Sequence, residues 1–160
     1  MKSTVLPAVL FVCLGNIIRS PLAEAALRRA AERAGLDLEV DSAATSSYHT
    51  GKAPDPRAFA AAERHGLDIS ACSARQIGPE DFLRFTHIFA ADRGVLKSVR
   101  HVVPTGSIAE IALMLDCVKG REGQSVADPY FSEEPAFDAT VADVTAVADA
   151  LIKRFGRRSS

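Results

Sequence analysis

Residues 9–21 read VLFVCLGNIIRSP, an apolar run followed by a short polar loop. The apolar residues 9–12 are typical of a buried strand in a parallel sheet, and the strand is expected to end at Cys13. Ser20 is a good helix N-cap and Pro21 suits the first helical position, so a helix is predicted from Pro21 onward. A strand, a loop and a helix N-terminus in this order present a nest of backbone N–H groups that binds anions.

The loop carries a thiol at one end and a guanidinium at the other. Cys13 and Arg19 are spaced as Cys-x5-Arg, so the loop can curl around one tetrahedral oxyanion, with the thiol below it and the guanidinium at its side. A helix N-terminus and a neighbouring arginine favour the thiolate form of a cysteine, which is the nucleophile. The competing interpretation of Cys13 is a buried cysteine at a strand end without a chemical role. The predicted phosphate-binding and supporting residues are Leu14, Gly15, Asn16, Ile17, Ile18 and Ser20.

The composition predicts a single domain. With 160 residues, 48% of them hydrophobic, the chain can bury one core, and we expect a domain over residues 1–156 with a short tail over 157–160. A net charge of −1 argues against a nucleic-acid partner. No run of 18 apolar residues occurs, and residues 1–6 are too short and too polar for a signal peptide, so no membrane association is expected.

The cysteines and histidines indicate neither disulfides nor a metal. Cys13, Cys72 and Cys117 are an odd number without metal-type spacing, which is typical of a reduced protein in the cytoplasm. The four histidines also lack ligand spacing. We therefore expect a cytoplasmic protein that needs no metal and no cofactor.

Strand and helix patterns alternate along the chain. This alternation predicts an α/β domain, a parallel sheet with right-handed crossovers and helices on both faces, whose ligand binds beyond the carboxyl ends of the strands. Asp55 and Asp92 are expected helix N-caps, and Gly35, Gly66 and Gly156 expected helix ends. The predicted strands are 9–12, 38–40, 86–90 and a fourth between 102 and 115, where 108–115 is also compatible with a helix; the predicted helices are 21–34, 56–65, 94–99 and one through 141–155.

The loop CLGNIIRSP resembles the phosphate loop of the low-molecular-weight protein tyrosine phosphatases, and the resemblance covers nearly the whole chain. It implies a four-stranded parallel sheet of flavodoxin-like order, the phosphotyrosine phosphatase I-like fold. It also implies hydrolysis of phosphotyrosine and small aryl phosphates through a phosphocysteine on Cys13, with Arg19 binding the transition state. The implied partners are a phosphotyrosine-containing protein substrate and a phosphate or other oxyanion in the loop.

Asp128 is the candidate proton donor, because the leaving oxygen of a phosphate ester needs a proton. The following Pro129 holds Asp128 in an extended conformation. Family members carry an Asp-Pro-Tyr at this place, and the resemblance makes Asp128 the general acid and then the base that activates water. Tyr130, and Tyr48 from the loop after the second strand, are the predicted pocket walls, which would favour a flat phenyl phosphate. The alternative for all three is an ordinary loop or surface residue.

The sequence departs from the family pattern at several positions. Ile18 stands where many members have a second cysteine that protects the nucleophile from oxidation. Cys72 aligns with a histidine that contacts the loop asparagine, which puts the support of Asn16 in doubt. Cys72 is either a resolving thiol for the nucleophile or, more simply, a small buried residue. Phe131 replaces a frequent second tyrosine, and Val95 a frequent asparagine.

Two other functions compete with the phosphatase. An arsenate reductase uses the same kind of oxyanion loop but needs two further thiols close in sequence, whereas Cys72 and Cys117 are far apart. A non-catalytic phosphate-binding module would tolerate loss of Cys13 or Asp128, yet both are present. The combination of Cys13, Arg19 and Asp128 therefore favours the phosphatase.

Overall fold

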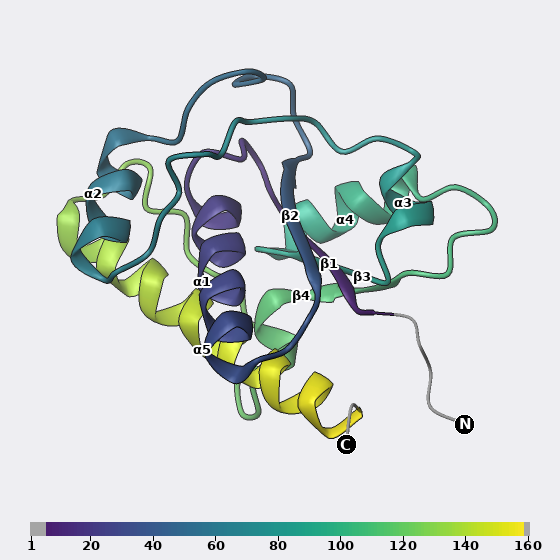
Figure 1. Cartoon of the computed structure of the whole chain (residues 1–160). Coiled ribbons are helices and arrows are strands. Elements are labelled where there is room, and N and C mark those ends of the chain that lie inside the picture. The colour runs from purple at the N-terminus through teal and green to yellow at the C-terminus, as the bar shows by residue number, and fades with distance from the viewer. Residues whose placement is uncertain (1–5, 159–160) are drawn as a thin grey trace.

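A computed structural model describes residues 6–158 of the chain. Four parallel strands form one sheet in the order β2-β1-β3-β4, and helices cover both of its faces (Figure 1). The order is that of a flavodoxin-like sheet, so the predicted fold class is confirmed. The strands are β1 (Ala8–Cys13), β2 (Glu39–Ala44), β3 (His87–Ala90) and β4 (Glu110–Leu113); the helices are α1 (Arg19–Ala34), α2 (Pro56–Arg64), α3 (Asp81–Arg84), α4 (Arg93–Val102) and α5 (Glu134–Arg158), with a 3-10 turn η1 (Met114–Cys117).

β1 lies inside the sheet and is buried along its whole length. Because side chains alternate between the two faces of a strand, β1 supplies residues to both halves of the core. One half, packed against α1, α2 and α5, takes Val9, Phe11 and Cys13; the other, packed against α3 and α4, takes Ala8, Leu10 and Val12. A strand buried on both faces accounts for the continuous apolar run in the sequence.

The loop after β1 lies where the strand order of the sheet reverses. β1 pairs with β2 on one side and with β3 on the other, so the chain leaves β1 in one direction and later returns to its opposite edge. Ligands in open parallel sheets bind beyond the carboxyl ends of the strands at such a switch point. Cys13 is the last residue of β1 and therefore lies at this point.

The prediction that Ser20 caps the first helix is wrong. α1 begins at Arg19, one residue earlier, and its N-cap position is Ile18, which makes no side-chain capping bond. The Ser20 hydroxyl is instead bonded to Cys13 and Asn16 in the loop. The predicted end of the helix is confirmed, since Gly35 takes the left-handed C-cap conformation with φ 67°.

Other element boundaries differ by a few residues from the predicted ones. Asp55 caps α2 by accepting from the Arg57 N–H, and Asp92 caps α4 by accepting from the Val95 N–H, both as predicted. β2 runs from Glu39 to Ala44, well beyond the predicted strand at 38–40, because the four residues after Val40 pair in parallel with β1. The ambiguous fourth segment forms a strand, and α3 and η1 were not predicted.

The prediction that Gly156 ends the last helix is also wrong. α5 continues to Arg158 because a glycine costs a helix only about 1 kcal/mol, and buried Leu151 and Phe155 anchor this end. The predicted tail therefore begins inside α5, and residues 159–160 lie outside the described residues, as do residues 1–5 of the segment considered for a signal peptide. Among residues 6–158, no helix has the length and apolar character of a membrane span.

The packing of α5 predicts a large effect of Leu151→Ala on stability. Leu151 is fully buried on the α1 side of the core, so truncation should lower the free energy of unfolding by roughly 2–5 kcal/mol. The exposed neighbour Lys153 is the control, and Lys153→Ala should change stability by less than about 0.5 kcal/mol. Urea unfolding of both variants measures the difference, and equal midpoints would contradict the assigned packing of α5.

Candidate active site

The loop from Cys13 to Arg19 turns sharply between β1 and α1. Asn16 adopts a left-handed conformation with φ 58°, and it is the only non-glycine residue among residues 6–158 to do so. This turn brings the Asn16 N–H to 3.3 Å from the Cys13 sulfur. A Cβ on Gly15 would lie 2.9 Å from Cδ2 of His49, so a side chain there would displace the His49 ring. The predicted roles of Gly15 and Asn16 in forming a tight loop fit this geometry.

The Ser20 hydroxyl is positioned to donate to the Cys13 sulfur. The two atoms are 3.0 Å apart. The Arg75 N–H donates to Oδ1 of Asn16, which fixes the orientation of the Asn16 amide. Nδ2 of Asn16 then donates to the Ser20 oxygen at 2.7 Å. That oxygen already accepts a hydrogen bond from Asn16, and the Cys13 sulfur at 3.0 Å is nearer than the Ala43 carbonyl at 3.5 Å, so the hydroxyl hydrogen can be directed at the sulfur, where it stabilises a thiolate.

Two residues that sequence reasoning missed complete the support of Asn16. Nδ2 of Asn16 also donates to the Ser42 hydroxyl at 3.0 Å, and that hydroxyl donates to Oε1 of Glu24 at 2.7 Å. Glu24 is almost fully buried on α1. A usable signal was present, because Ser20 and Glu24 are four residues apart and share one face of the helix. Asn16 is therefore held firmly without a histidine at position 72.

Arg19 is buried behind the loop and held by fixed acceptors. Its NH1 group donates to Oδ2 of Asp92 at 2.8 Å and to the Val126 carbonyl at 2.9 Å. Its NH2 group lies 3.6 Å from Oδ2 of Asp128. Asp92 uses its other oxygen to cap α4, so the helix cap also orients the guanidinium. Sequence reasoning found the cap at Asp92 but missed this second contact.

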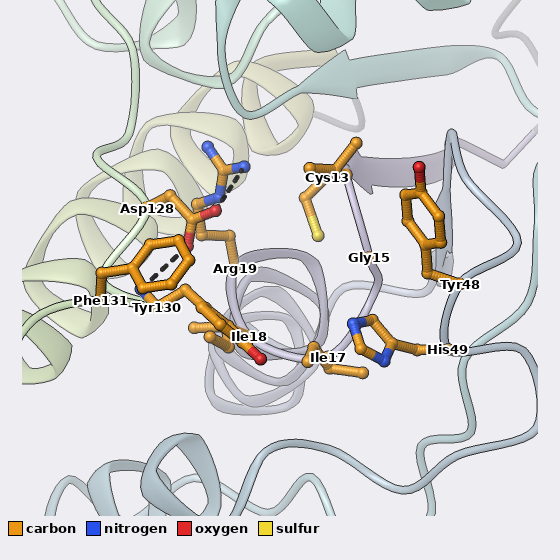
Figure 2. A pocket seen from close by; sticks show the side chains of 11 residues that line it. Cys13, Gly15, Ile17, Ile18, Arg19, Tyr48, His49, Asp128, Tyr130 and Phe131 are labelled. Carbon is orange, nitrogen blue, oxygen red and sulfur yellow. Dashed lines mark hydrogen bonds and ion pairs between the residues drawn. The ribbon is translucent and has the colours of Figure 1, made fainter.

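The Asp128 carboxylate lies on the same side of the pocket as Arg19, across from Cys13 (Figure 2). Its Oδ1 accepts a hydrogen bond from the Tyr130 N–H at 3.1 Å, and its Oδ2 faces Arg19. The Asp128 side chain is 43% exposed, so its carboxyl group can reach both a bound ester and water. This placement is consistent with the predicted proton donor.

The pocket above the loop has a volume of about 220 Å³. Tyr48 and His49 stand on one side of it, and Asp128, Tyr130 and Phe131 on the other (Figure 2). Of the predicted site residues, Asn16 and Ser20 lie beneath the pocket rather than in its lining. Those in the lining are Cys13, Leu14, Gly15, Ile17, Ile18, Arg19, Tyr48, Asp128 and Tyr130. His49 and Phe131 are additional lining residues.

Cys72 is poorly suited to be a resolving thiol. Burial, and then the nearby Glu24 carboxylate, raise the pKa of Cys72 to about 12, so the residue stays a protonated thiol. Its sulfur contacts Oε1 of Glu24 at 3.9 Å, and the chain of contacts from there to Cys13 passes through Ser42 and Asn16. These contacts favour the simpler interpretation of Cys72 as a packing residue.

Comparisons with known proteins show the family of the chain. The family model described as low molecular weight phosphotyrosine protein phosphatase matches residues 8–160. The chain belongs to this family. A phosphatase of this name from Schizosaccharomyces pombe is 39% identical over 132 residues, which cover 81% of this chain and 84% of the relative. The family shows that the chain is an enzyme, a protein tyrosine phosphatase, as predicted.

Solved structures of family members have the same fold. The protein tyrosine phosphatase from Entamoeba histolytica, with HEPES in its active site, has a TM-score of 0.89 at 29% identity and covers 96% of this chain and 99% of its own. A Drosophila arginine phosphatase has a TM-score of 0.87 at 31% identity, covering 92% of this chain and 97% of its own. The fold of these family members therefore extends over nearly the whole length of this chain.

The environments of the three cysteines predict selective alkylation. Burial raises the pKa of Cys72 and of Cys117 to about 12, whereas the Cys13 sulfur receives hydrogen bonds that stabilise a thiolate. At neutral pH, iodoacetate should therefore modify Cys13 first, and inorganic phosphate should slow that modification. Peptide mass spectrometry over a time course measures both effects. Modification of Cys72 at the same rate as Cys13 would contradict the assigned environments.

Proposed function

We propose that this phosphatase hydrolyses phosphotyrosine in proteins, and small aryl phosphates, through a phosphocysteine on Cys13. The observation that carries the proposal is the convergence of three groups on one pocket: the Cys13 sulfur, the Arg19 guanidinium and the Asp128 carboxyl. A nucleophile, a binder of the transition-state charge and a proton donor are the groups that phosphoryl transfer from an ester requires.

In the first step the Cys13 thiolate attacks phosphorus, so an S–P bond forms as the P–O bond to the aryl group breaks. Protonated Asp128 gives its proton to the leaving oxygen, which departs as a neutral phenol. The charge on the transferring group spreads over its three outer oxygens. Arg19 and the loop N–H groups bind these oxygens, and Arg19 is held in place beforehand by Asp92 and the Val126 carbonyl.

In the second step water attacks the phosphocysteine. The Asp128 carboxylate, ionised by the first step, takes the proton from water, so inorganic phosphate forms and Asp128 regains its acid form. The S–P bond breaks and the electron pair returns to sulfur. The Ser20 hydroxyl, 3.0 Å from that sulfur, stabilises the departing thiolate. The proposed cycle consumes only the ester and water.

The pocket walls favour an aromatic ester. Tyr48, Tyr130 and Phe131 stand around the mouth of the pocket and offer ring faces and edges to a phenyl group. A phosphoserine is shorter, so its phosphorus would stop above the sulfur. HEPES carries a sulfonate, and its presence in the active site of the Entamoeba relative supports oxyanion binding in this loop. The cytoplasmic location and the single domain over residues 1–156 stay predictions.

Phosphoarginine is a second candidate substrate, because one structural relative is named an arginine phosphatase. Its P–N bond can be broken by the same nucleophile and acid. The aromatic residues at the pocket mouth favour phosphotyrosine as the first candidate.

The dependence of rate on the leaving group tests the mechanism. With aryl phosphates and no added metal, Cys13→Ser should show no measurable turnover. Asp128→Ala should reduce kcat/KM on the order of a hundredfold for a poor leaving group such as phenol, and much less for nitrophenol, which leaves without a proton.

The same assay decides between the candidate functions. Phosphotyrosine and phosphoarginine peptides of one sequence are compared side by side, and a higher kcat/KM for the phosphotyrosine peptide is expected. If the reduced protein binds phosphate but hydrolyses neither aryl phosphates nor these peptides, the proposed function is wrong.

A further inference from the structure

The start of α2 is attached directly to the phosphate loop. The Asp55 N–H donates to the Ile17 carbonyl at 3.0 Å, which joins α2 to the middle of the loop. The Asp55 carboxylate then caps the helix by accepting the Arg57 N–H at 2.8 Å. α2 therefore begins at a position that is fixed relative to the bound oxyanion.

The Arg57 guanidinium extends this attachment to the other side of the pocket. Its Nε and NH2 groups donate to the two oxygens of Asp55 at 3.1 and 2.8 Å, a bidentate pair. These bonds hold the pKa of Asp55 below its usual range. The remaining NH1 group donates to the Tyr130 carbonyl at 2.9 Å. The planar Arg57 guanidinium thus bridges Asp55, which is bonded to the phosphate loop, and Tyr130, which follows Asp128 in the chain.

Aromatic rings fix the plane of the Arg57 guanidinium. Its Cζ lies 4.7 Å from the centre of the Phe137 ring and 5.4 Å from that of the Tyr130 ring, both cation–π distances. Phe137 is fully buried on α5 and provides a rigid base. A planar guanidinium matches this site, whereas a lysine could neither fork to Asp55 nor stack in the same way.

The backbone of Tyr130 transmits this restraint to Asp128. Tyr130 accepts from Arg57 at its carbonyl and donates its N–H to Oδ1 of Asp128 at 3.1 Å. The second oxygen of Asp128 faces Arg19 at 3.6 Å. The Asp128 side chain is 43% exposed, so these contacts, rather than burial, orient its carboxyl group.

We propose that Arg57 is a positioning residue that ties the Asp128 segment to the phosphate loop, so that the general acid reaches the leaving oxygen. The proposal rests on the proposed function of Asp128. Arg57 touches neither the substrate nor the reacting atoms; it acts through the backbone of Tyr130. Its loss should therefore affect the proton-transfer part of the reaction and leave oxyanion binding intact.

The chain offers a matched control for this proposal. Arg64, also on α2, pairs with Asp138 at 2.9 Å and Glu134 at 3.3 Å and so joins α2 to α5 away from the pocket. Arg57→Ala keeps the cap of α2, because Asp55 accepts from the backbone N–H of residue 57. Arg57→Ala and Arg64→Ala thus both remove an arginine contact from the same helix, but only the first touches the Asp128 segment.

The test measures kcat/KM for phenyl phosphate and nitrophenyl phosphate in wild type, Arg57→Ala, Arg57→Lys and Arg64→Ala. Arg57→Ala should lose about tenfold with phenyl phosphate and less than about twofold with nitrophenyl phosphate, since misplacement of the acid matters only where a proton is needed. Arg57→Lys should show the same pattern, and Arg64→Ala should match wild type. In an Asp128→Ala background, Arg57→Ala should cause no further loss.

Four results would overturn the proposal. An equal loss with both substrates would show that Arg57 supports binding or folding, and so would a further loss in the Asp128→Ala background. An equal loss in Arg64→Ala would show that any weakening of α2 has this effect. If Asp128→Ala loses kcat/KM equally with both substrates, Asp128 is not the general acid and both proposals fail. If Asp128→Ala shows the expected difference between the substrates but Arg57→Ala does not, the proposed function stands and the positioning role is wrong.

Discussion

The structure depends on one constraint: the short loop between β1 and α1 has to turn tightly around one point, the Cys13 sulfur, toward which the Asn16 N–H is directed. A loop that turns so tightly needs a left-handed residue, and Asn16 provides it with φ 58°. An asparagine there costs less than a bulkier residue because its amide bonds locally. In this protein the amide receives the Arg75 N–H and donates to Ser20 and Ser42. The backbone turn and the hydrogen-bond network around the sulfur are thus supported by one side chain.

The charged groups of the site are arranged around the same point. Arg19 is buried, and a buried cation is stable only when it is paired and hydrogen-bonded. Asp92 and the Val126 carbonyl hold one end of its guanidinium, while Asp128 lies near the other. A bound phosphoryl group would therefore meet a cation whose orientation was set during folding. Such preorganisation means that little reorganisation is required in the transition state.

Much of the fold followed from local chemistry in the sequence. The apolar run before Cys13 indicated a central parallel strand, and Asp55, Asp92 and Gly35 marked helix ends by capping rules that the structure bears out. The errors arose where tertiary contacts overrode local preference. Ser20 has the ideal chemistry of an N-cap, yet the sulfur of Cys13 and the amide of Asn16 take its hydroxyl.

The site was predictable where its residues are close in sequence, and less so where they are distant. The loop and the Asp128 segment carry short sequence motifs, CLGNIIRSP and Asp-Pro-Tyr, that are recognisable in a single sequence. Ser42, Arg75 and Asp92 contact Asn16 or Arg19 from three other segments, and only the assembled fold brings them together. Long-range pairing of this kind leaves no periodic or spacing signal in a single chain.

Formation of a phosphocysteine is the central claim, and trapping it is the most direct measurement. The wild-type protein is mixed with an aryl phosphate, quenched in acid within the first turnovers, digested and analysed by mass spectrometry. The account predicts a phosphoryl group on the peptide that contains Cys13, absent when Cys13→Ser is treated in the same way. Turnover without a phosphoryl group on that peptide, or with one on another residue, would contradict it.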